Sequence, residues 1–197
     1  MNSRDKILET IANNKPAPAP LPEINIDALQ DSSALMQQFK NILQSIGATV
    51  INADNIQTVK SDLQTGVANG LQIINTIDVL GSINNEVTVT SGAVFLESVD
   101  IAYIAGTLGV AENGAIWLEE SKIINRLLPF ICQHLVIVLD PVKIVANMHE
   151  AYQQITIDKE GYGVFLAGPS KTADIEQSLV IGAHGAKSVK VFLVNQP

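Results

Sequence analysis

The sequence has few charged residues, few aromatic residues and no long hydrophobic run. Of its 197 residues, 16% are charged and 5% are aromatic, whereas 47% are hydrophobic. A chain of this length and apolar content can bury the core of one domain, which excludes wholesale disorder. No apolar run approaches the ~20 residues that a membrane-spanning helix needs, and no apolar segment follows a basic one at the N-terminus, as a signal peptide requires. We therefore expect a cytoplasmic protein.

Cysteine occurs once, at Cys132. A single cysteine excludes an internal disulfide, and it excludes a four-cysteine iron–sulfur site supplied by this chain alone. Because Cys132 lies in an apolar stretch with no adjoining positive charge, we expect a buried, inert thiol rather than a nucleophile. The three histidines show no spacing typical of metal ligands, so we expect no dedicated zinc site.

Acidic residues outnumber basic ones, and the formal net charge is -8 at pH 7. Binding to nucleic acid or to an anionic membrane surface rests on lysine and arginine. The charge therefore predicts neither kind of partner, although it leaves room for a local cationic pocket.

The first 22 residues differ in character from the rest. Ile7, Leu8 and Ile11 fall on one side of a short expected helix, and prolines then alternate along Lys15–Pro22. Alternating prolines favour extended polyproline geometry, which predicts a semi-rigid spacer. We expect residues 1–22 to form an N-terminal helix and linker, and residues 23–197 to form one α/β domain. The arm can fold over its own domain or dock on a partner; the sequence favours the first.

The body alternates patterns typical of helices and strands. Helices are expected before Gly47, around Val145–Ile155 and over Thr172–Val180. Strands or β-rich pieces are expected at Ala48–Asn52, Leu71–Ile77, Val87–Thr90, Ala93–Val99, Ile101–Ile104, Ala115–Leu118, Leu135–Leu139, Gly163–Ala167 and Val189–Val194. Strands that alternate with helices indicate βαβ units. We therefore predict an α/β fold with a mostly parallel sheet and helices on both faces.

Three loops carry glycines and polar residues between expected elements: Gly109–Gly114, Gly168–Asp174 and Gly182–Ser188. Ligands of open α/β sheets bind at the carboxyl ends of the strands, where loops lead into helices. The three loops are therefore candidate places for a ligand, and the sequence leaves open whether they share one site.

The second loop offers two hydroxyls and the Lys171 ammonium ahead of the expected helix, a combination that can hold a carboxylate or a phosphate. Two features oppose this interpretation. Asp174 and Glu176 already place negative charge in the expected first turn, and Ser and Thr are the preferred helix caps. From the residues alone, helix capping is the favoured interpretation.

His184 lies between two glycines, so we expect an accessible imidazole whose charge changes near neutral pH. The roles of a surface polar group and of a catalytic residue suit His184 about equally well.

Glu112 precedes an Asn-Gly pair, and such a pair most often indicates the turn of a β-hairpin. A lone carboxylate at the tip of apolar strands is also how a nucleophile or base is presented.

The candidate catalytic residues are therefore Glu112 and His184. The candidate ligand-binding residues are Gly114, Gly168, Ser170, Lys171, Thr172, Asp174 and Gly185. No residue is a candidate metal ligand.

Several segments resemble the lactate-utilization protein C family, whose members carry the LUD domain. Gly168–Val180 resembles the family's G-P-S-[RK]-T-A-D-I-E stretch, Gly182–Gly185 fits the G-[VA]-H-G that follows, and Leu127–Pro129 matches its L-L-P. Where the family usually reads A-E-T-G-T, this chain has Asn113 and Ala115 in place of both threonines. The chain is thus similar to a divergent, shorter branch.

The resemblance implies a fold like that of glucosamine-6-phosphate deaminase, ribose-5-phosphate isomerase and the coenzyme A transferases. It also implies a role in oxidising L-lactate to pyruvate beside two partner proteins that carry iron–sulfur clusters. This chain would then hold no cofactor, in keeping with its one cysteine.

Three functions remain open, in this order. The first is a cluster-free component of an iron–sulfur lactate oxidation system that binds a small carboxylate or its partner subunits. The second is a stand-alone enzyme similar to a coenzyme A transferase or sugar-phosphate isomerase. It would use Glu112, because Glu112–Gly114 is similar to the strip that carries the nucleophilic glutamate of family I coenzyme A transferases. The third is a regulatory module that binds a metabolite without turning it over.

Overall fold

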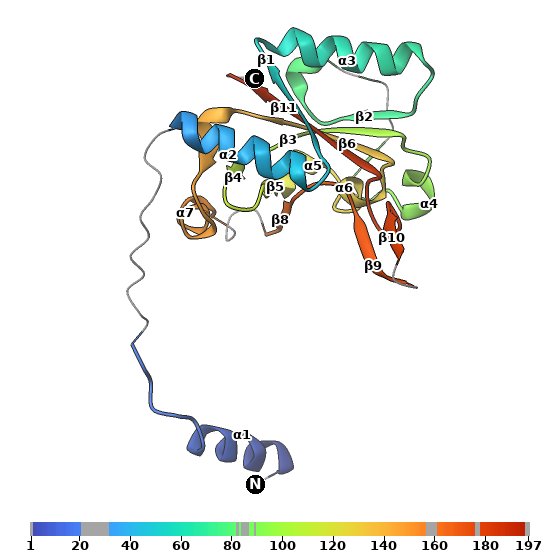
Figure 1. The fold of residues 1–197 in the computed structure, drawn as a ribbon. Coiled ribbons are helices and arrows are strands. Elements are labelled where there is room, and N and C mark those ends of the chain that lie inside the picture. The colour runs from blue at the N-terminus through green and yellow to red at the C-terminus, as the bar shows by residue number, and fades with distance from the viewer. Residues whose placement is uncertain are drawn as a thin grey trace.

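The structure is a computed structural model that describes residues 2–20, 32–81, 83, 87–88, 90–156, 161–175 and 178–195. Figure 1 shows a twisted central sheet with helices on both sides, a smaller sheet beside it and a projecting hairpin. The predicted α/β class, with a mostly parallel sheet between helices, is confirmed.

The central sheet has five parallel strands in the order β1-β11-β6-β3-β2. Their bounds are β1 Thr49–Ala53, β2 Ile73–Asn75, β3 Ile101–Ala105, β6 His134–Leu139 and β11 Ser188–Val194. A parallel sheet is covered on both faces, so its strands are almost continuously apolar. The runs in β6 and β11 have this character, which is why the sequence predicted both strands.

One helix covers each face of this sheet. Helix α2 (Ser32–Ser45) buries Phe39 and Leu43 against one face, and α3 (Ile56–Ala68) buries Val59 and Leu63 against the other. Side chains alternate along a strand, so β6 serves both cores: Leu135, Ile137 and Leu139 join α2, whereas Val136 and Val138 join α3.

A second sheet has the order β7-β4-β5-β8. Its strands are β4 Leu108–Val110, β5 Ile116–Glu119, β7 Ile144–Val145 and β8 Gly163–Leu166. Trp117 on β5 packs against Phe165 on β8, with ring centroids 4.8 Å apart. Helix α7 (Met148–Gln154) contributes the buried Ala151 to the same cluster. Because Ile116 and Leu118 point instead into the α2 core, this sheet is held against the central one.

The remaining elements are short. They are the 3-10 turns η1 (Asp78–Leu80) and η2 (Pro141–Lys143) and the helices α4 (Ala93–Leu96), α5 (Glu120–Ile123) and α6 (Leu128–Ile131). The prediction of β structure over Ala93–Val99 is wrong, because the segment turns into α4 after Gly92 and buries only Leu96 and Val99. Of Val87–Thr90, the described residues 87, 88 and 90 form no strand either.

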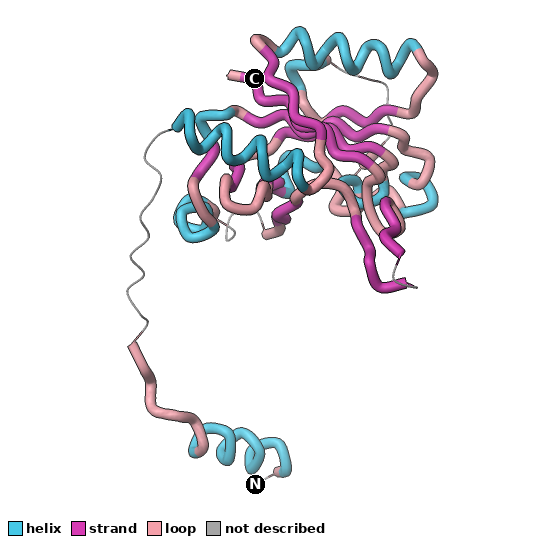
Figure 2. Tube along the Cα trace, viewed as in Figure 1, coloured by secondary structure: helices cyan, strands magenta, loops and turns pink. Residues whose placement is uncertain are grey.

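The helix predicted over Thr172–Val180 is also wrong. Strands β9 (Lys171–Ile175) and β10 (Ser178–Ile181) form an antiparallel hairpin there, seen as a projecting pair of strands in Figure 2. A hydrogen bond from the Gly182 N–H to the Ser170 carbonyl, 3.0 Å long, closes its base. The β-branched residues of the segment suit strands as well as its spacing suits a helix, and this pairing across twelve residues decides between the two.

The N-terminal helix α1 (Ser3–Asn13) begins after Asn2, whose side chain accepts a hydrogen bond from the Asp5 N–H. It buries none of its residues. Residues 15–20 of the proline-rich stretch have no regular structure, whereas residues 21–22 of the predicted linker lie outside the described part. The domain boundary after residue 22 stays a prediction. Within the described residues, no helix combines the length and the apolar character needed to cross a lipid bilayer.

Candidate functional site

Two adjoining hollows surround His184 at the amino-terminal edge of the central sheet. Loop Gly182–Lys187 leads into β11, and Cys132 and Gln133 lead into β6. Because both strands begin at this edge, the expectation that loop Gly182–Ser188 lies at the carboxyl ends is wrong. Ligands of open α/β sheets bind at loops that follow the carboxyl ends of strands, whereas this loop precedes the amino-terminal end of β11.

Backbone hydrogen bonds join the segments that form the hollows. The Ser170 N–H donates to the Ala186 carbonyl over 3.0 Å, and the Gly182 N–H donates to the Ser170 carbonyl over the same distance. The Lys187 N–H donates to the Gln133 carbonyl over 2.8 Å. These bonds connect both signature loops to the segment before β6, so the hollows have a fixed backbone frame.

The smaller hollow has a volume of about 220 Å³. It lies between α6 and the loop that connects β8 to β9, and Gly168, Ser170, His184 and Gly185 all line it. Its lining residues are Pro129, Phe130, Leu166, Ala167, Gly168, Pro169, Ser170, His184, Gly185 and Ala186. The Ser170 hydroxyl and the His184 imidazole supply its polar side chains.

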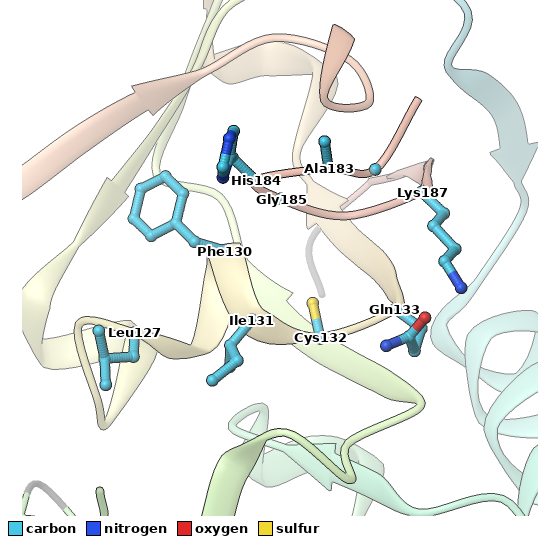
Figure 3. A pocket seen from close by; sticks show the side chains of 10 residues that line it. Leu127, Phe130, Ile131, Cys132, Gln133, Ala183, His184, Gly185 and Lys187 are labelled. Carbon is cyan, nitrogen blue, oxygen red and sulfur yellow. The ribbon is translucent and has the colours of Figure 1, made fainter. Parts of the chain in front are cut away.

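The larger hollow, of about 430 Å³, lies on the other side of His184. The two hollows share Phe130, His184 and Gly185. Figure 3 shows the His184 ring beside the Phe130 ring, with Leu127 and Ile131 on one side of the hollow and Gln133 and Lys187 on the other. Cys132, Gly182 and Ala183 complete its lining.

Glycine is required at two points of this frame. A Cβ atom on Gly185 would lie 3.1 Å from the Cβ of Ser170, where the hollows meet. Gly168 has a φ of +66°, and its Cβ would lie 3.0 Å from Cγ1 of Ile46 on the loop after α2. A side chain on Gly185 would press on Ser170 of the other signature loop, whereas a side chain on Gly168 would press on Ile46 and would need a strained backbone.

The electrostatics of the hollows oppose those of the whole chain. None of the described residues that line them is acidic, although the chain carries a net charge of -8. Lys187 is exposed and lines the larger hollow, and the exposed His184 imidazole lies between the two. A bound anion would therefore meet hydrogen-bond donors without a facing carboxylate from the described lining.

Of the other predicted residues of the second loop, Lys171 lines neither hollow. Lys171 reaches back over the turn after α2, where its Nζ would lie 3.4 Å from a Cβ on Gly47. Thr172 and Asp174 lie on β9. Because this segment is a strand, the predicted helix capping by Ser170 or Thr172 is wrong, and an anion at this loop would not meet a helix N-terminus.

Glu112 and Gly114 lie on the turn between β4 and β5, so the hairpin predicted from Asn113-Gly114 is confirmed. The Asn113 side chain accepts a hydrogen bond from the Ala115 N–H, 2.9 Å long. A Cβ on Gly114 would lie 3.2 Å from Ile42 on α2. The Glu112 side chain is exposed and lines neither hollow. The structure thus joins Ser170 to His184 but does not join Glu112 to them.

The thiol of Cys132 forms part of the floor of the larger hollow yet is only 1% exposed. Burial raises its pKa from 9.0 to about 12, against smaller opposing effects of backbone hydrogen bonds. At neutral pH the thiol is therefore protonated, as expected of an inert cysteine.

Across the residues that the structure describes, no group of three or more His, Cys, Asp or Glu side chains could hold a metal ion. His134 instead makes a 2.8 Å hydrogen bond to the Ser188 hydroxyl at the start of β11. His149 is exposed on α7.

Of the residues that line the larger hollow, only His184 and Gly185 were predicted site residues; those missed include Leu127, Phe130, Gln133 and Lys187. Leu127 lay within the matched L-L-P motif, and Lys187 lay within the third loop. Their apolar and basic character was visible in the sequence, but their meeting depends on the close approach of the segments before β6 and β11.

Parts of this chain are similar to known proteins. Residues 95–194 match the LUD domain. The lactate utilization protein C of Oceanobacillus iheyensis is 28% identical over 109 residues, which are 52% of this chain and 46% of that protein. The lactate utilization protein C of an Exiguobacterium species is 30% identical over 105 residues, 47% of this chain and 46% of that protein. The chain thus spans about half the length of the curated relatives it matches.

A crystal structure of a DUF162 family protein from Deinococcus radiodurans shares the fold, with a TM-score of 0.60 and 15% sequence identity. The likeness covers 84% of this chain and 99% of that one. Since the domain match covers more than half of the 197 residues, and since both signature loops form one framed site within it, this chain belongs to the LUD domain family.

Proposed function

We propose that this protein is a component of L-lactate utilization that binds a small carboxylate in the smaller hollow. The observation that carries the proposal is the meeting of Ser170 and His184 in a hollow whose described lining has no acidic side chain. A carboxylate there can accept hydrogen bonds from the hydroxyl and from an imidazole N–H. The relatives named lactate utilization protein C favour lactate or pyruvate as the carboxylate.

We further propose that the protein acts beside partner subunits that carry iron–sulfur clusters, with lactate oxidised to pyruvate in the assembly. This chain has one cysteine, and that cysteine is buried with a raised pKa. Such a thiol is a poor cluster ligand, because ligation requires the thiolate. A cluster-free role is therefore the one that its residues support.

Binding can be tested by NMR titration of the purified chain with L-lactate and pyruvate, following the amide signals of Gly168, Ser170 and Gly185. Ser170→Ala and His184→Ala should each weaken binding by about tenfold, since each removes a hydrogen bond to a charged group. Ser98→Ala and His149→Ala, at exposed sites away from the hollows, serve as matched controls. Equal affinity in all four variants would contradict the proposal.

Whether Glu112 takes part in lactate binding is tested by the same titration. Because Glu112 lines neither hollow, Glu112→Gln should leave lactate affinity unchanged. A loss of binding in this variant would show that the hairpin completes the site.

The proposal of iron–sulfur partner subunits is tested by isolating the protein from its host. Recovery without a cysteine-rich partner, together with undiminished growth on lactate after gene deletion, would refute it.

A further inference from the structure

We infer that the larger hollow binds an organic anion with an apolar body, of the kind represented by a medium-chain carboxylate, with its charged end at Lys187. The inference rests on the proposed function, because it assumes that the small carboxylate binds in the smaller hollow. The two hollows would then form one site with two compartments on either side of His184.

The larger hollow has the volume that a second, bulkier ligand group requires. Ligand pockets commonly span about 300–1,000 Å³. The larger hollow, at about 430 Å³, falls in this range, whereas the smaller, at about 220 Å³, does not. A three-carbon acid in the smaller hollow leaves the larger one unfilled, so a second and bulkier group can bind at the same time.

One wall of the larger hollow is apolar and partly exposed. Leu127, just before α6, is 43% exposed and Phe130 on α6 is 39% exposed, and Ile131 of the same helix also lines the hollow (Figure 3). An apolar ligand group would remove this surface from water. On the usual scale of transfer free energies, each methylene that becomes buried raises the affinity about threefold to fourfold.

The opposite wall carries a cation. The backbone of Lys187 is fixed by its hydrogen bond to Gln133, whereas its side chain is exposed. The ion pairs found among the described side chains join Arg126 to Glu120 and Lys190 to Asp62, so neither involves Lys187. With no acidic residue in the described lining, the ammonium favours an anionic group on the ligand.

The test uses four probes and the full chain. Octanoate, octan-1-ol and octan-1-amine share one chain length but differ in charge, and acetate has the charge without the chain. NMR titration that follows the amides of Gln133, Ala183 and Lys187 should show octanoate binding at least tenfold more tightly than each of the other three. Leu127→Ser should weaken octanoate binding by about tenfold, and Lys187→Gln should abolish the preference for octanoate over octan-1-ol.

The controls come from a separate apolar hollow beside α3, away from His184, whose lining includes Lys60 and Val67. Lys60→Gln and Val67→Ser should leave octanoate binding unchanged. Two results would overturn the inference: equal binding of octanoate and octan-1-ol, or sensitivity of octanoate to the α3 variants in place of Leu127 and Lys187. Ser170→Ala separates the two proposals, because it should weaken lactate binding but leave octanoate binding intact.

Discussion

Ser170 and Gly185 meet where the two hollows adjoin, with the Cβ of Ser170 3.1 Å from the position that a Cβ on Gly185 would take. The two residues lie 15 positions apart, on either side of the β9–β10 hairpin, and the bond from the Ser170 N–H to the Ala186 carbonyl holds them together. The hairpin thus brings the loop that follows β10 back beside the loop that precedes β9, so that both signature loops line one site.

Gly185→Ala is therefore expected to displace Ser170 and to narrow the junction. Overpacking of this kind costs about 1–3 kcal/mol, and we expect lactate affinity to fall by about fivefold or more while the fold persists. NMR titration gives the affinity, and denaturant unfolding gives the stability. Gly92→Ala is the matched control, since a Cβ there meets no atom within 4 Å; equal effects of the two substitutions would show that the junction is not tight.

Asp62 on α3 accepts hydrogen bonds from the Tyr103 hydroxyl at 2.8 Å and from Lys190 Nζ at 2.7 Å. Asp62→Ala would leave the hydroxyl of the fully buried Tyr103 without this acceptor. We expect a loss of about 1–3 kcal/mol in the free energy of unfolding, measured with urea. The double variant Asp62→Ala with Tyr103→Phe should be more stable than Asp62→Ala alone, because it removes the hydroxyl that lost its acceptor. A double variant less stable than Asp62→Ala alone would contradict this expectation.

The same pair predicts a loss of stability at alkaline pH. Burial, and next the hydrogen bond to Asp62 and the negative charge of that carboxylate, raise the pKa of Tyr103 well above its ordinary value of 10.0. The native state therefore keeps a proton that the unfolded state loses above about pH 10. The contribution of Tyr103 to stability is complete below pH 10 and is lost as the pH rises toward the native pKa. Urea unfolding at pH 9 to 11 should show this decline, and Tyr103→Phe should reduce it.

Cys132 is expected to resist alkylation in the folded protein. The rise of its pKa from 9.0 to about 12 lowers the thiolate fraction at pH 8 by about a thousandfold. Iodoacetamide should thus modify the native thiol far more slowly than the thiol of the urea-unfolded chain, as read by mass spectrometry. Comparable rates in the two states would mean that the floor of the larger hollow opens readily.

Gly163→Ala is expected to disturb the smaller sheet, because a Cβ on Gly163 would overlap the indole of Trp117. We expect a destabilisation of about 1–3 kcal/mol and a shift in the emission of Trp117, which is the single tryptophan of the chain. Gly161→Ala is no suitable comparison, since Gly161 has a φ of +74°. Gly92→Ala again supplies the control, and an unchanged spectrum for Gly163→Ala would contradict the packing of Trp117 on β8.

Much of the fold could be predicted from local pattern. Leu135–Leu139 and Val189–Val194 are apolar runs of strand length, and such runs suit a parallel sheet that is covered on both faces. Asn113-Gly114 signalled a tight hairpin because its backbone geometry favours these residues. In contrast, Thr172–Val180 fitted a helix and a strand equally well by residue type. A bond between residues 170 and 182 decided its structure, and no local pattern contains such a bond.

The sequence by itself determined that this is an α/β protein with LUD-domain signatures, with one cysteine and with more acidic than basic residues. These properties follow from residue types and their order. Only the tertiary structure decided that Ser170 and His184 share a hollow at the amino-terminal edge of the sheet, with Phe130 and Lys187 in the adjoining walls and Glu112 outside both. That arrangement depends on the register of β6 with β11 and on the return of the β9–β10 hairpin, which are contacts between segments far apart in the chain.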